Sequence, residues 1–434
     1  MDQKAKKIDT QQNVDTKICT YSFVLGRKYM LSATELMSVL SNSQSETKDV
    51  QQPEILNFNQ QALTCKCALP IPFPQKQLNN LGGTIKIVKI FNQVTKSNKD
   101  EVQSIGDIIN EYLLDKFQNI EHKVKYGISV YSLAKKNEQN IKNLLKNSKK
   151  FLKSHNINPR FINKNFKSLS NVIISKEKII EKGAEIVLIY HQDHIYIGET
   201  VAIQDFESYS KRDYEKPERD PKRGMLPPKI AQIMINLAAP NPQATIYDPF
   251  CGNGTILMEA LLMGMNVKGS DLDPTSIKAT NKNIYWLKQQ NPDIKNLKID
   301  TFKKDATQIS QTDIQDTNAI IAETYLGPPL KKLPPSHVIK QTFHTLSTLY
   351  LNFFKNLSTL LPKGFPIVIA IPAYKSNNDY IYIENLPQKI EQLGYKQENL
   401  LPQTLNLPTN KRNSLIYDRK NQVVAREIIK FKKI

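Results

Sequence analysis

A short glycine-containing string at residues 248–255 (Asp-Pro-Phe-Cys-Gly-Asn-Gly-Thr) constrains the fold of this chain more than any other segment. An apolar run precedes it and a helical pattern comes after it, which predicts a turn from a strand into a helix. Gly252 and Gly254 allow a tight turn and a close approach of a ligand, because neither has a side chain. Asp248 ends the strand, at the edge where open α/β sheets bind ligands. The alternative is a tight turn without a ligand, and the motifs further along the chain favour a binding site.

The same string resembles the first motif of S-adenosylmethionine (SAM)-dependent methyltransferases that modify exocyclic amines of nucleic-acid bases. The resemblance implies a Rossmann-like α/β domain with SAM as the cofactor. It also implies that the cofactor lies against the turn. The residues expected to contact it there are Asp248, Pro249, Phe250, Cys251, Gly252, Gly254 and Thr255.

More acidic residues come after the next two expected strands. Asp271 lies 19 residues after Gly252, where a carboxylate accepts hydrogen bonds from ribose hydroxyls. Asp273 has the pattern of a helix N-cap, so we favour Asp271 for the ribose; the alternative is that both residues are caps. Asp305 and Ala306 come directly after the third strand. In such a fold, a carboxylate at this position reaches the adenine amine and the next backbone N–H reaches a ring nitrogen.

The fourth expected strand ends in residues 323–329 (Glu-Thr-Tyr-Leu-Gly-Pro-Pro), where the target base would bind. Methylation of an amine requires an acceptor that holds the NH2 group and an aromatic face that stacks on the base. Glu323 is the candidate acceptor and Tyr325 the candidate stacking residue, while Pro328 and Pro329 stiffen the loop. The alternative is a rigid structural loop.

The domain organisation can be inferred from the length and from the pattern of strands and helices. The chain has 434 residues, enough for about two to four domains. In its N-terminal half, short strands and helices indicate small α+β units. Within the first of them, Ser32 and Glu35 have the spacing of a helix capping box. The expected units are residues 1–16 (flexible N-terminus), 17–100 and 101–205 (two α+β domains), 206–224 (linker) and 225–434 (doubly wound α/β domain).

The charge of the chain points to a polyanionic partner. The formal net charge is +19, and nucleic acid is the partner that such an excess favours. A genome bias toward lysine and asparagine is the alternative explanation. One predicted helix has a basic face that is either solvated or in contact with RNA. Its residues are Lys142, Lys146, Lys149, Lys150 and Lys153.

Neither a metal site nor a membrane segment is expected. Cys65 and Cys67 are too close together for a usual zinc pair, and no second pair accompanies them. His191 and His194 lie between two strand-like runs, so a polar hairpin turn is expected instead of a metal site. No apolar stretch is long enough to span a membrane, and no signal-peptide pattern is present. We therefore expect a cytosolic protein.

Segments along the chain resemble tRNA guanine N2-methyltransferases that carry a THUMP domain, especially those acting on guanine-10. The resemblance implies that residues 17–100 are ferredoxin-like and that residues 101–205 form a THUMP-like RNA-binding domain. It implies methyl transfer from SAM to the N2 amine of guanine in tRNA, with large-subunit rRNA as the alternative substrate. The THUMP-like segments argue against DNA. The segments that carry the resemblance are residues 23–35, 125–131, 196–205, 212–217, 224–231, 414–419 and 424–428.

The loop after the fourth strand departs from the family pattern, which is usually Asp-Pro-Pro-Tyr. In that pattern the aspartate and the first proline carbonyl hold the amine, and the tyrosine stacks on the base. Glu323 keeps the carboxylate but adds a methylene group. A misplacement of about an ångström can cost about a hundredfold in rate. The departure leaves open a function of another class, a SAM- and tRNA-binding protein without turnover.

Overall fold

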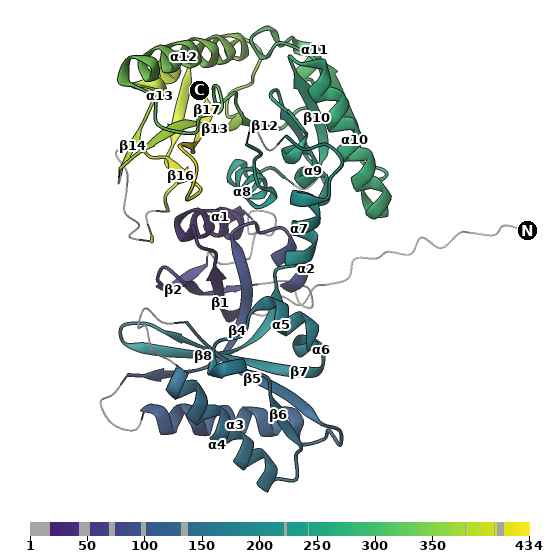
Figure 1. Ribbon diagram of the computed structural model, residues 1–434, viewed down its shortest axis with the longest axis vertical. Helices are drawn as coiled ribbons and strands as arrows, with labels where there is room; N and C mark the ends of the chain where they lie inside the picture. The colour runs from purple at the N-terminus through teal and green to yellow at the C-terminus, as the bar shows by residue number, and fades with distance from the viewer. Residues whose placement is uncertain are drawn as a thin grey trace, which may run out of the picture.

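In the computed structural model, the described residues form two β-sheets, one from each half of the chain (Figure 1). Helix α1 (Tyr29–Asn42) lies between them and packs against helix α8 (Pro228–Ala238) of the C-terminal half. The described residues are 18–42, 53–68, 74–96, 101–131, 138–220, 224–241, 243–377, 379–402, 404–405 and 412–434. The N-terminal segment expected to be flexible, residues 1–16, lies outside these ranges.

The first sheet has the strand order β2-β3-β1-β4-β8-β7-β5-β6. Its strands are β1 (Ile18–Leu25), β2 (Glu54–Phe58), β3 (Ala62–Ala68), β4 (Thr84–Thr95), β5 (Val124–Tyr131), β6 (Pro159–Phe161), β7 (Gly183–Tyr190) and β8 (His194–Ile203). Strand β5 pairs in parallel with β6 and β7, and the other pairs are antiparallel. The long strand β4 pairs with β8, so one sheet runs through both of the expected α+β domains.

Helices complete this half of the molecule. They are α2 (Pro74–Asn79), α3 (Glu101–Phe117), α4 (Glu138–Ser154), α5 (Asn171–Lys176), α6 (Ile179–Lys182) and the 3-10 turn η1 (Lys164–Phe166). Apolar residues recur every four positions in α3, and Ile105, Ile109 and Leu113 are buried in a shared core. Helix α4 buries its apolar face in the same core. The predicted basic face of α4 is confirmed, because all five of its lysines are partly or fully exposed.

The second sheet has the order β11-β10-β9-β12-β13-β17-β15, with β14 paired to β13 and β16 paired to β17. Its strands are β9 (Thr245–Asp248), β10 (Asn266–Asp271), β11 (Ile299–Lys303), β12 (Ala319–Glu323), β13 (Pro366–Ser376), β14 (Asp379–Ile381), β15 (Tyr395–Glu398), β16 (Leu415–Tyr417) and β17 (Val424–Lys433). The strands from β11 to β13 are parallel, and β17 is antiparallel to β13.

Strands β10 and β11 follow β9 in the chain and lie along one edge of β9. The chain then crosses over, and β12 pairs with the opposite edge of β9. The crevice beside β9 is therefore the topological switch point, where doubly wound sheets bind ligands. This arrangement confirms the predicted Rossmann-like fold. The remaining helical elements are α7 (Phe206–Tyr214), α9 (Thr255–Leu262), α10 (Pro274–Gln290), η2 (Pro292–Ile294), η3 (Ala306–Gln308), α11 (Gln311–Ile314), α12 (Ser336–Ser358) and α13 (Leu386–Glu391).

The capping box predicted at Ser32 and Glu35 is wrong. Helix α1 begins at Tyr29, so Ser32 lies inside the helix and its hydroxyl donates to a backbone carbonyl of the preceding turn. Glu35 is fully buried and accepts hydrogen bonds from the backbone N–H groups of Gly82 (2.8 Å) and Gly83 (2.7 Å) and from Nδ2 of Asn236 (2.7 Å). Burial raises the pKa of Glu35 to about 7, against these hydrogen bonds. Because Asn236 belongs to α8, this carboxyl group connects the two halves of the molecule.

In the segment expected to be a linker, residues 206–224, the described part up to residue 220 contains helix α7 and packs on the C-terminal half. Arg212 of α7 forms a buried ion pair with Glu259 of α9, with an Nε–Oε1 distance of 2.6 Å. Lys216 is also buried, and its Nζ donates to Oγ1 of Thr255 (2.9 Å). Burial lowers the pKa of Lys216. Residues 206–220 are thus a structured part of the α/β domain surface.

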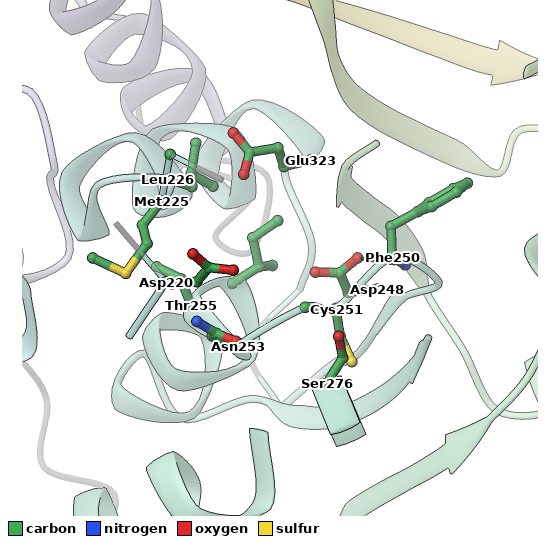
Figure 2. Close-up of a pocket in the computed structure, with 13 residues that line it drawn as sticks. Asp220, Met225, Leu226, Asp248, Phe250, Cys251, Asn253, Thr255, Ser276 and Glu323 are labelled. Atoms are coloured by element: carbon green, nitrogen blue, oxygen red, sulfur yellow. Dashed lines mark hydrogen bonds between the residues drawn. The ribbon is translucent and has the colours of Figure 1, made fainter. Parts of the chain in front are cut away.

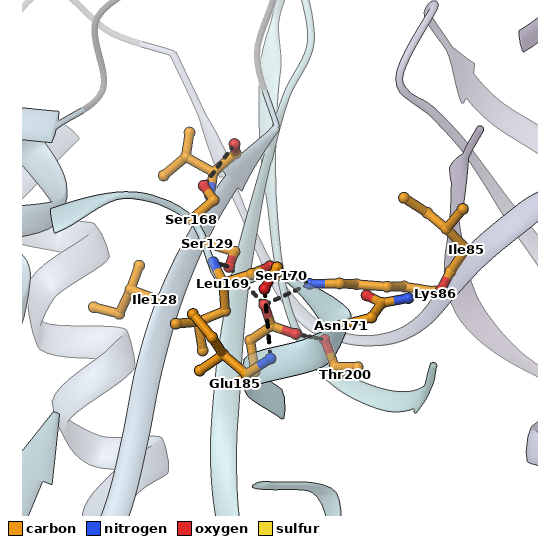
Figure 3. A network of polar contacts seen from close by, with 12 residues as sticks. Ile85, Lys86, Ile128, Ser129, Ser168, Leu169, Ser170, Asn171, Glu185 and Thr200 are labelled. Atoms are coloured by element: carbon orange, nitrogen blue, oxygen red, sulfur yellow. Dashed lines mark hydrogen bonds and ion pairs between the residues drawn. The ribbon is translucent and has the colours of Figure 1, made fainter. Parts of the chain in front are cut away.

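A buried polar network joins four strands of the first sheet (Figure 3). Lys86 of β4 donates to Oε1 of Glu185 (2.7 Å) and to the carbonyl of Leu169 (3.1 Å). The hydroxyls of Ser129 and Thr200 each donate to the Glu185 carboxylate at 2.5 Å. All of these polar side chains are almost completely buried, so the carboxylate depends on the network for its solvation.

Two smaller expectations can be compared with the structure. His191 and His194 flank the turn between β7 and β8, as predicted for a polar hairpin. Within the described ranges, no cluster of side chains is suited to hold a metal ion. The helices in those ranges are also too short or too polar to cross a bilayer.

Candidate active site

The glycine turn joins strand β9 to helix α9, as the sequence predicts. Asp248 ends β9 and is almost completely buried, and Thr255 is the first residue of α9. Both turn glycines have positive φ angles, 51° at Gly252 and 77° at Gly254, which residues with a Cβ rarely adopt. A Cβ on Gly254 would also lie 2.9 Å from the side chain of Thr280. The turn therefore depends on glycine at these positions.

A pocket opens beside this turn and encloses about 590 Å³ of empty space, part of it open to solvent (Figure 2). Of the predicted site residues, those that line it are Asp248, Phe250, Cys251, Gly252, Thr255 and Glu323. The predicted residues outside its lining are Pro249, Gly254, Asp271, Asp305, Ala306 and Tyr325. The structure thus brings the turn and the end of the fourth strand of the α/β domain together around one space.

The two carboxylates predicted to contact the nucleoside part of the cofactor have local partners. Asp271 accepts hydrogen bonds from the N–H groups of Gly252 (3.0 Å) and Asp273 (2.9 Å), so it braces the turn from the adjacent strand. Asp273 caps helix α10, as predicted. Asp305 accepts from the N–H and hydroxyl of Thr307, both at 2.8 Å, and caps η3. Their roles toward ribose and adenine stay predictions.

Several lining residues were missed by the sequence reasoning. They are Asp220, Gly224, Met225, Leu226, Asn253, Ile256 and Ser276. Asp220 and the stretch from residue 224 to 226 come from the end of the expected linker and the start of the α/β domain. The signal that could have found them is the charged segment with Gly-Met-Leu-Pro-Pro directly after it, from which we inferred a domain boundary and a family resemblance but no site residue.

The pocket favours a positively charged ligand. Figure 2 shows the carboxylates of Asp220, Asp248 and Glu323 around the same space, each from a different segment. Burial raises the pKa of Asp248 well above its usual range, and the neighbouring carboxylates of Asp271 and Glu323 raise it further. A cation in the pocket would offset both effects, because it stabilises the ionised carboxylate. The sulfonium and ammonium groups of SAM fit this donor set.

Glu323 is held by a residue that the sequence reasoning did not identify. Nε of Arg426, on β17, donates to Oε1 of Glu323. The side chain of Arg426 is 3% exposed and that of Glu323 is 20% exposed, so the ion pair is largely shielded from water. A second nitrogen of Arg426, Nη2, donates to the carbonyl oxygen of Gly224 at 3.2 Å. One oxygen of the candidate acceptor is therefore already occupied.

Tyr325 lies on the loop after β12. The residue is 56% exposed, and its backbone carbonyl accepts a hydrogen bond of 2.6 Å from the hydroxyl of Tyr350. Burial raises the pKa of Tyr350, which keeps this hydroxyl protonated as a donor. The buried Tyr350 thus holds the backbone of the loop in place, while the aromatic ring of Tyr325 remains accessible for stacking.

A second pocket adjoins the first. Gly224 lines both pockets, and Arg426 lines the second while its partner Glu323 lines the first. The rest of the second pocket consists of the proline-containing loop and a short stretch at the start of β17, namely Leu326, Gly327, Pro328, Pro329, Leu330, Gln422, Val423 and Val424. The Glu323–Arg426 pair therefore lies at the junction of two spaces, one beside the glycine turn and one beside the loop.

Curated proteins of known activity are similar to parts of this chain. It is 29% identical over 184 residues to tRNA (guanine(10)-N2)-dimethyltransferase of Methanothermobacter thermautotrophicus, a match that covers 42% of this chain and 48% of that protein. It is 30% identical over 128 residues to the Pyrococcus abyssi protein of the same name, covering 28% and 37% of the two chains. The matches span about half, or less, of the length of these relatives.

Solved structures and a family model agree with the fold. TrmN from Thermus thermophilus superposes with a TM-score of 0.53 at 13% identity, over 96% of this chain and all of that one. The model for RMKL-like methyltransferase domains matches residues 217–325, which include the glycine turn, Glu323 and Tyr325. The segment of this chain that is similar to the RMKL-like methyltransferase domain therefore contains both halves of the pocket.

Proposed function

We propose that this protein is a SAM-dependent RNA methyltransferase that acts on the N2 amine of guanine in tRNA. The observation that carries the proposal is the acidic pocket between the 248–255 turn and Glu323. It lies at the switch point of a methyltransferase-type sheet, and the presence of Glu323 in its lining supports a role for this carboxylate in holding an amine. The activity named for the curated relatives supports guanine in tRNA as the substrate.

For the cofactor, we propose that the glycine turn and the neighbouring carboxylates form the binding surface. When bound, SAM supplies a methyl group on a positively charged sulfur. Asp248 faces the pocket and its Oδ1 accepts the N–H of Phe250 (3.0 Å), which fixes the orientation of the carboxylate. Gly252 exposes its backbone beside the pocket, and Asp271 holds it in place from β10. A proposed role of Asp271 toward ribose hydroxyls is compatible with this bracing, because each carboxylate oxygen accepts more than one hydrogen bond.

For the acceptor, we propose that guanine enters the second pocket and presents its amine to Glu323. The other oxygen of Glu323, Oε2, accepts a hydrogen bond from the amine of guanine and directs the nitrogen lone pair toward the methyl group. In the transfer, the amine nitrogen would form a bond to the methyl carbon while the bond from that carbon to sulfur breaks and S-adenosylhomocysteine leaves. The proton that the nitrogen loses would pass to Glu323 or to water. Tyr325 stacks on the base from the surface of the loop.

For the RNA, we propose that the N-terminal half grips the phosphate backbone. The basic face of α4 supports this, since Lys146, Lys150 and Lys153 are exposed. Lys149 lies 5.5 Å from the ring centre of Phe161, and Lys142 lies equally close to that of Phe166, so aromatic rings are interleaved with the charges. Such a surface contacts RNA through charge and shape. The ferredoxin-like and THUMP-like assignments of residues 17–100 and 101–205, and a cytosolic location, are part of this proposal.

Labelled methyl transfer tests the proposed function. Purified protein is incubated with methyl-labelled SAM and, in parallel, with undermodified tRNA, rRNA or single-stranded DNA. The expected result is label in tRNA and none in DNA. Label in rRNA alone would replace tRNA by rRNA as the substrate, and no label in any nucleic acid would contradict the proposal.

A second candidate is a SAM- and tRNA-binding protein without turnover. It is favoured by Glu323, which replaces the usual aspartate and has one oxygen committed to Arg426. Calorimetry separates the two candidates, because the silent protein binds SAM and tRNA while the labelled-transfer assay stays at background.

A further inference from the structure

The ion pair between Glu323 and Arg426 crosses a strand of the sheet. Glu323 on β12 lies opposite Ala370 of β13, and Arg426 on β17 lies opposite Pro372 of β13. Ala370 and Pro372 are two positions apart, so all four residues project from the same face of the sheet. Strands β12 and β17 are about 10 Å apart, since neighbouring strands are separated by about 4.8 Å. Only a long side chain reaches from β17 to Glu323, and the small Ala370 leaves room for it to pass.

Arg426 is fixed on several sides besides the ion pair. Its Nη2 donates to the carbonyl of Gly224, and the guanidinium carbon lies 5.9 Å from the ring centre of Tyr417. Among the described residues, Glu323 is the carboxylate with which it pairs. A buried arginine held in this way has little freedom to move. It therefore imposes its own position on the carboxylate that it binds.

We propose that Arg426 is a positioning residue for methyl transfer, which holds Glu323 so that Oε2 faces the acceptor amine. The inference rests on the proposed function. Glutamate has one more rotatable bond than aspartate and its oxygens extend further, so by itself it would hold an amine less precisely. Anchoring Oε1 on Arg426 removes this freedom, and the longer side chain is what lets Glu323 meet the guanidinium. The pair thus replaces the geometry that a shorter aspartate gives by itself.

The position of the pair also explains how the two pockets are kept apart. Arg426 and Gly224 line the second pocket, and Glu323 and Gly224 line the first. The hydrogen bond from Arg426 to Gly224 joins the segment before α8 to this junction. Removal of the guanidinium would loosen the junction and leave Glu323, which lies beside Asp248, without its ion-pair partner.

Steady-state kinetics of Arg426→Met and Arg426→Lys, with tRNA and SAM, test the proposal. Arg426→Met is expected to lower kcat about a hundredfold, the scale of a misplacement of about an ångström, and Arg426→Lys about tenfold because one charged donor remains. The dissociation constant of SAM, measured by calorimetry, is expected to stay within about threefold, because the variants keep the carboxylates that attract the cation. A structural role alone would weaken SAM binding together with turnover.

Arg412→Met is the matched control. Arg412 forms a similar ion pair with the buried Glu427, which neighbours Arg426 on β17, with an Nε–Oε1 distance of 2.6 Å. Loss of the ion pair between Arg412 and Glu427 is expected to lower the free energy of unfolding and to leave kcat within about twofold. Glu427 and Arg426 are adjacent on β17, and adjacent residues of a strand face opposite sides of the sheet. If Arg426→Met does not fold, Arg426→Lys carries the test.

Two further variants determine whether Arg426 acts through Glu323. The double variant Arg426→Met/Glu323→Gln is expected to be no slower than Glu323→Gln. Both substitutions disrupt the same interaction, so the second adds no further loss of rate. Glu323→Asp is expected to be slower than wild type, because the shorter side chain withdraws from Arg426. Wild-type kcat in any Arg426 variant that folds, or additive losses in the double variant, would overturn the inference. A wild-type protein without transfer would instead contradict the proposed function.

Discussion

Replacing Glu35 by glutamine should remove a pH dependence from the stability of the contact between the two halves of the molecule. Glu35 is fully buried, and burial raises its pKa from 4.5 to about 7 in the folded protein. In an unfolded chain the carboxyl group regains its ordinary pKa. The folded state therefore binds more protons between these values, and its stability decreases as pH rises from the unfolded pKa through the folded one.

The size of the effect can be worked out from the shift in pKa. Each unit corresponds to about 1.4 kcal/mol, so the shift of Glu35 amounts to about 3 kcal/mol between about pH 4 and pH 8. Glutamine cannot ionise and contributes none of this slope. It also has only one carbonyl oxygen for the N–H groups of Gly82 and Gly83. Loss of one of these hydrogen bonds lowers stability by about 1–3 kcal/mol at every pH.

Urea unfolding of the wild type and of Glu35→Gln, from about pH 5 to pH 9, measures the difference. The wild type is expected to be the more stable protein at the acidic end, and the advantage should shrink or reverse by about pH 8. Glu54→Gln is the control, because Glu54 lies in an exposed ion pair with Lys66. A difference between wild type and Glu35→Gln that stays constant across this range would refute the reasoning.

Three further predictions concern the two sheets and the RNA surface. Lys86→Met should lower the free energy of unfolding by about 3–5 kcal/mol, because it leaves the Glu185 carboxylate buried and unpaired; denaturant unfolding checks this, and stability equal to wild type would contradict it. Gly254→Ala should abolish SAM binding or prevent folding, because the new Cβ would lie 2.9 Å from a neighbouring threonine in a turn that requires positive φ. Calorimetry measures SAM binding, and binding at wild-type affinity would show that the turn is not the cofactor site. Lys146→Glu and Lys150→Glu, both on α4, should weaken tRNA binding, and the slope of log K against log salt should fall by about 1 for each lysine–phosphate pairing that the substitution removes. Fluorescence titration at several salt concentrations measures this slope, SAM affinity is the control, and an unchanged slope would exclude α4 from the interface.

The glycine turn could be predicted from the sequence because its determinants are local. Gly252 and Gly254 have the positive φ angles that the turn requires, and Asp248 lies just before them at the end of a strand. The same holds for the amphipathic helix α4, whose apolar and basic residues alternate with helical period. In both cases the residues that decide the structure lie within a few turns of one another along the chain.

The role of Arg426, which was missed, depends on a contact between distant segments. Arg426 lies 103 residues from Glu323, and nothing near either residue in the sequence predicts their pairing. The capping box failed for the same reason, since Glu35 is bound by Asn236, 201 residues away. Local spacing gave Ser32 and Glu35 the pattern of a helix start, but burial against the C-terminal half determined the role of the carboxylate.

The continuity of the first sheet was likewise beyond a reading of local pattern. Strands β4 and β8 each have an ordinary strand sequence, and their pairing across about a hundred residues is set by tertiary packing. The buried pair of Lys86 and Glu185 lies at this junction and joins β4 to β7 through their side chains. Two expected α+β units therefore share one sheet.

The identity of the modified nucleoside tests the central claim most directly. Undermodified tRNA is incubated with purified protein and isotopically labelled SAM, and its nucleosides are separated and identified by mass spectrometry, with Glu323→Gln as the matched control. The proposal predicts labelled N2-methylguanosine or N2,N2-dimethylguanosine with the wild type and a large loss with the variant. Label on another atom or base, or equal labelling by the variant, would contradict it.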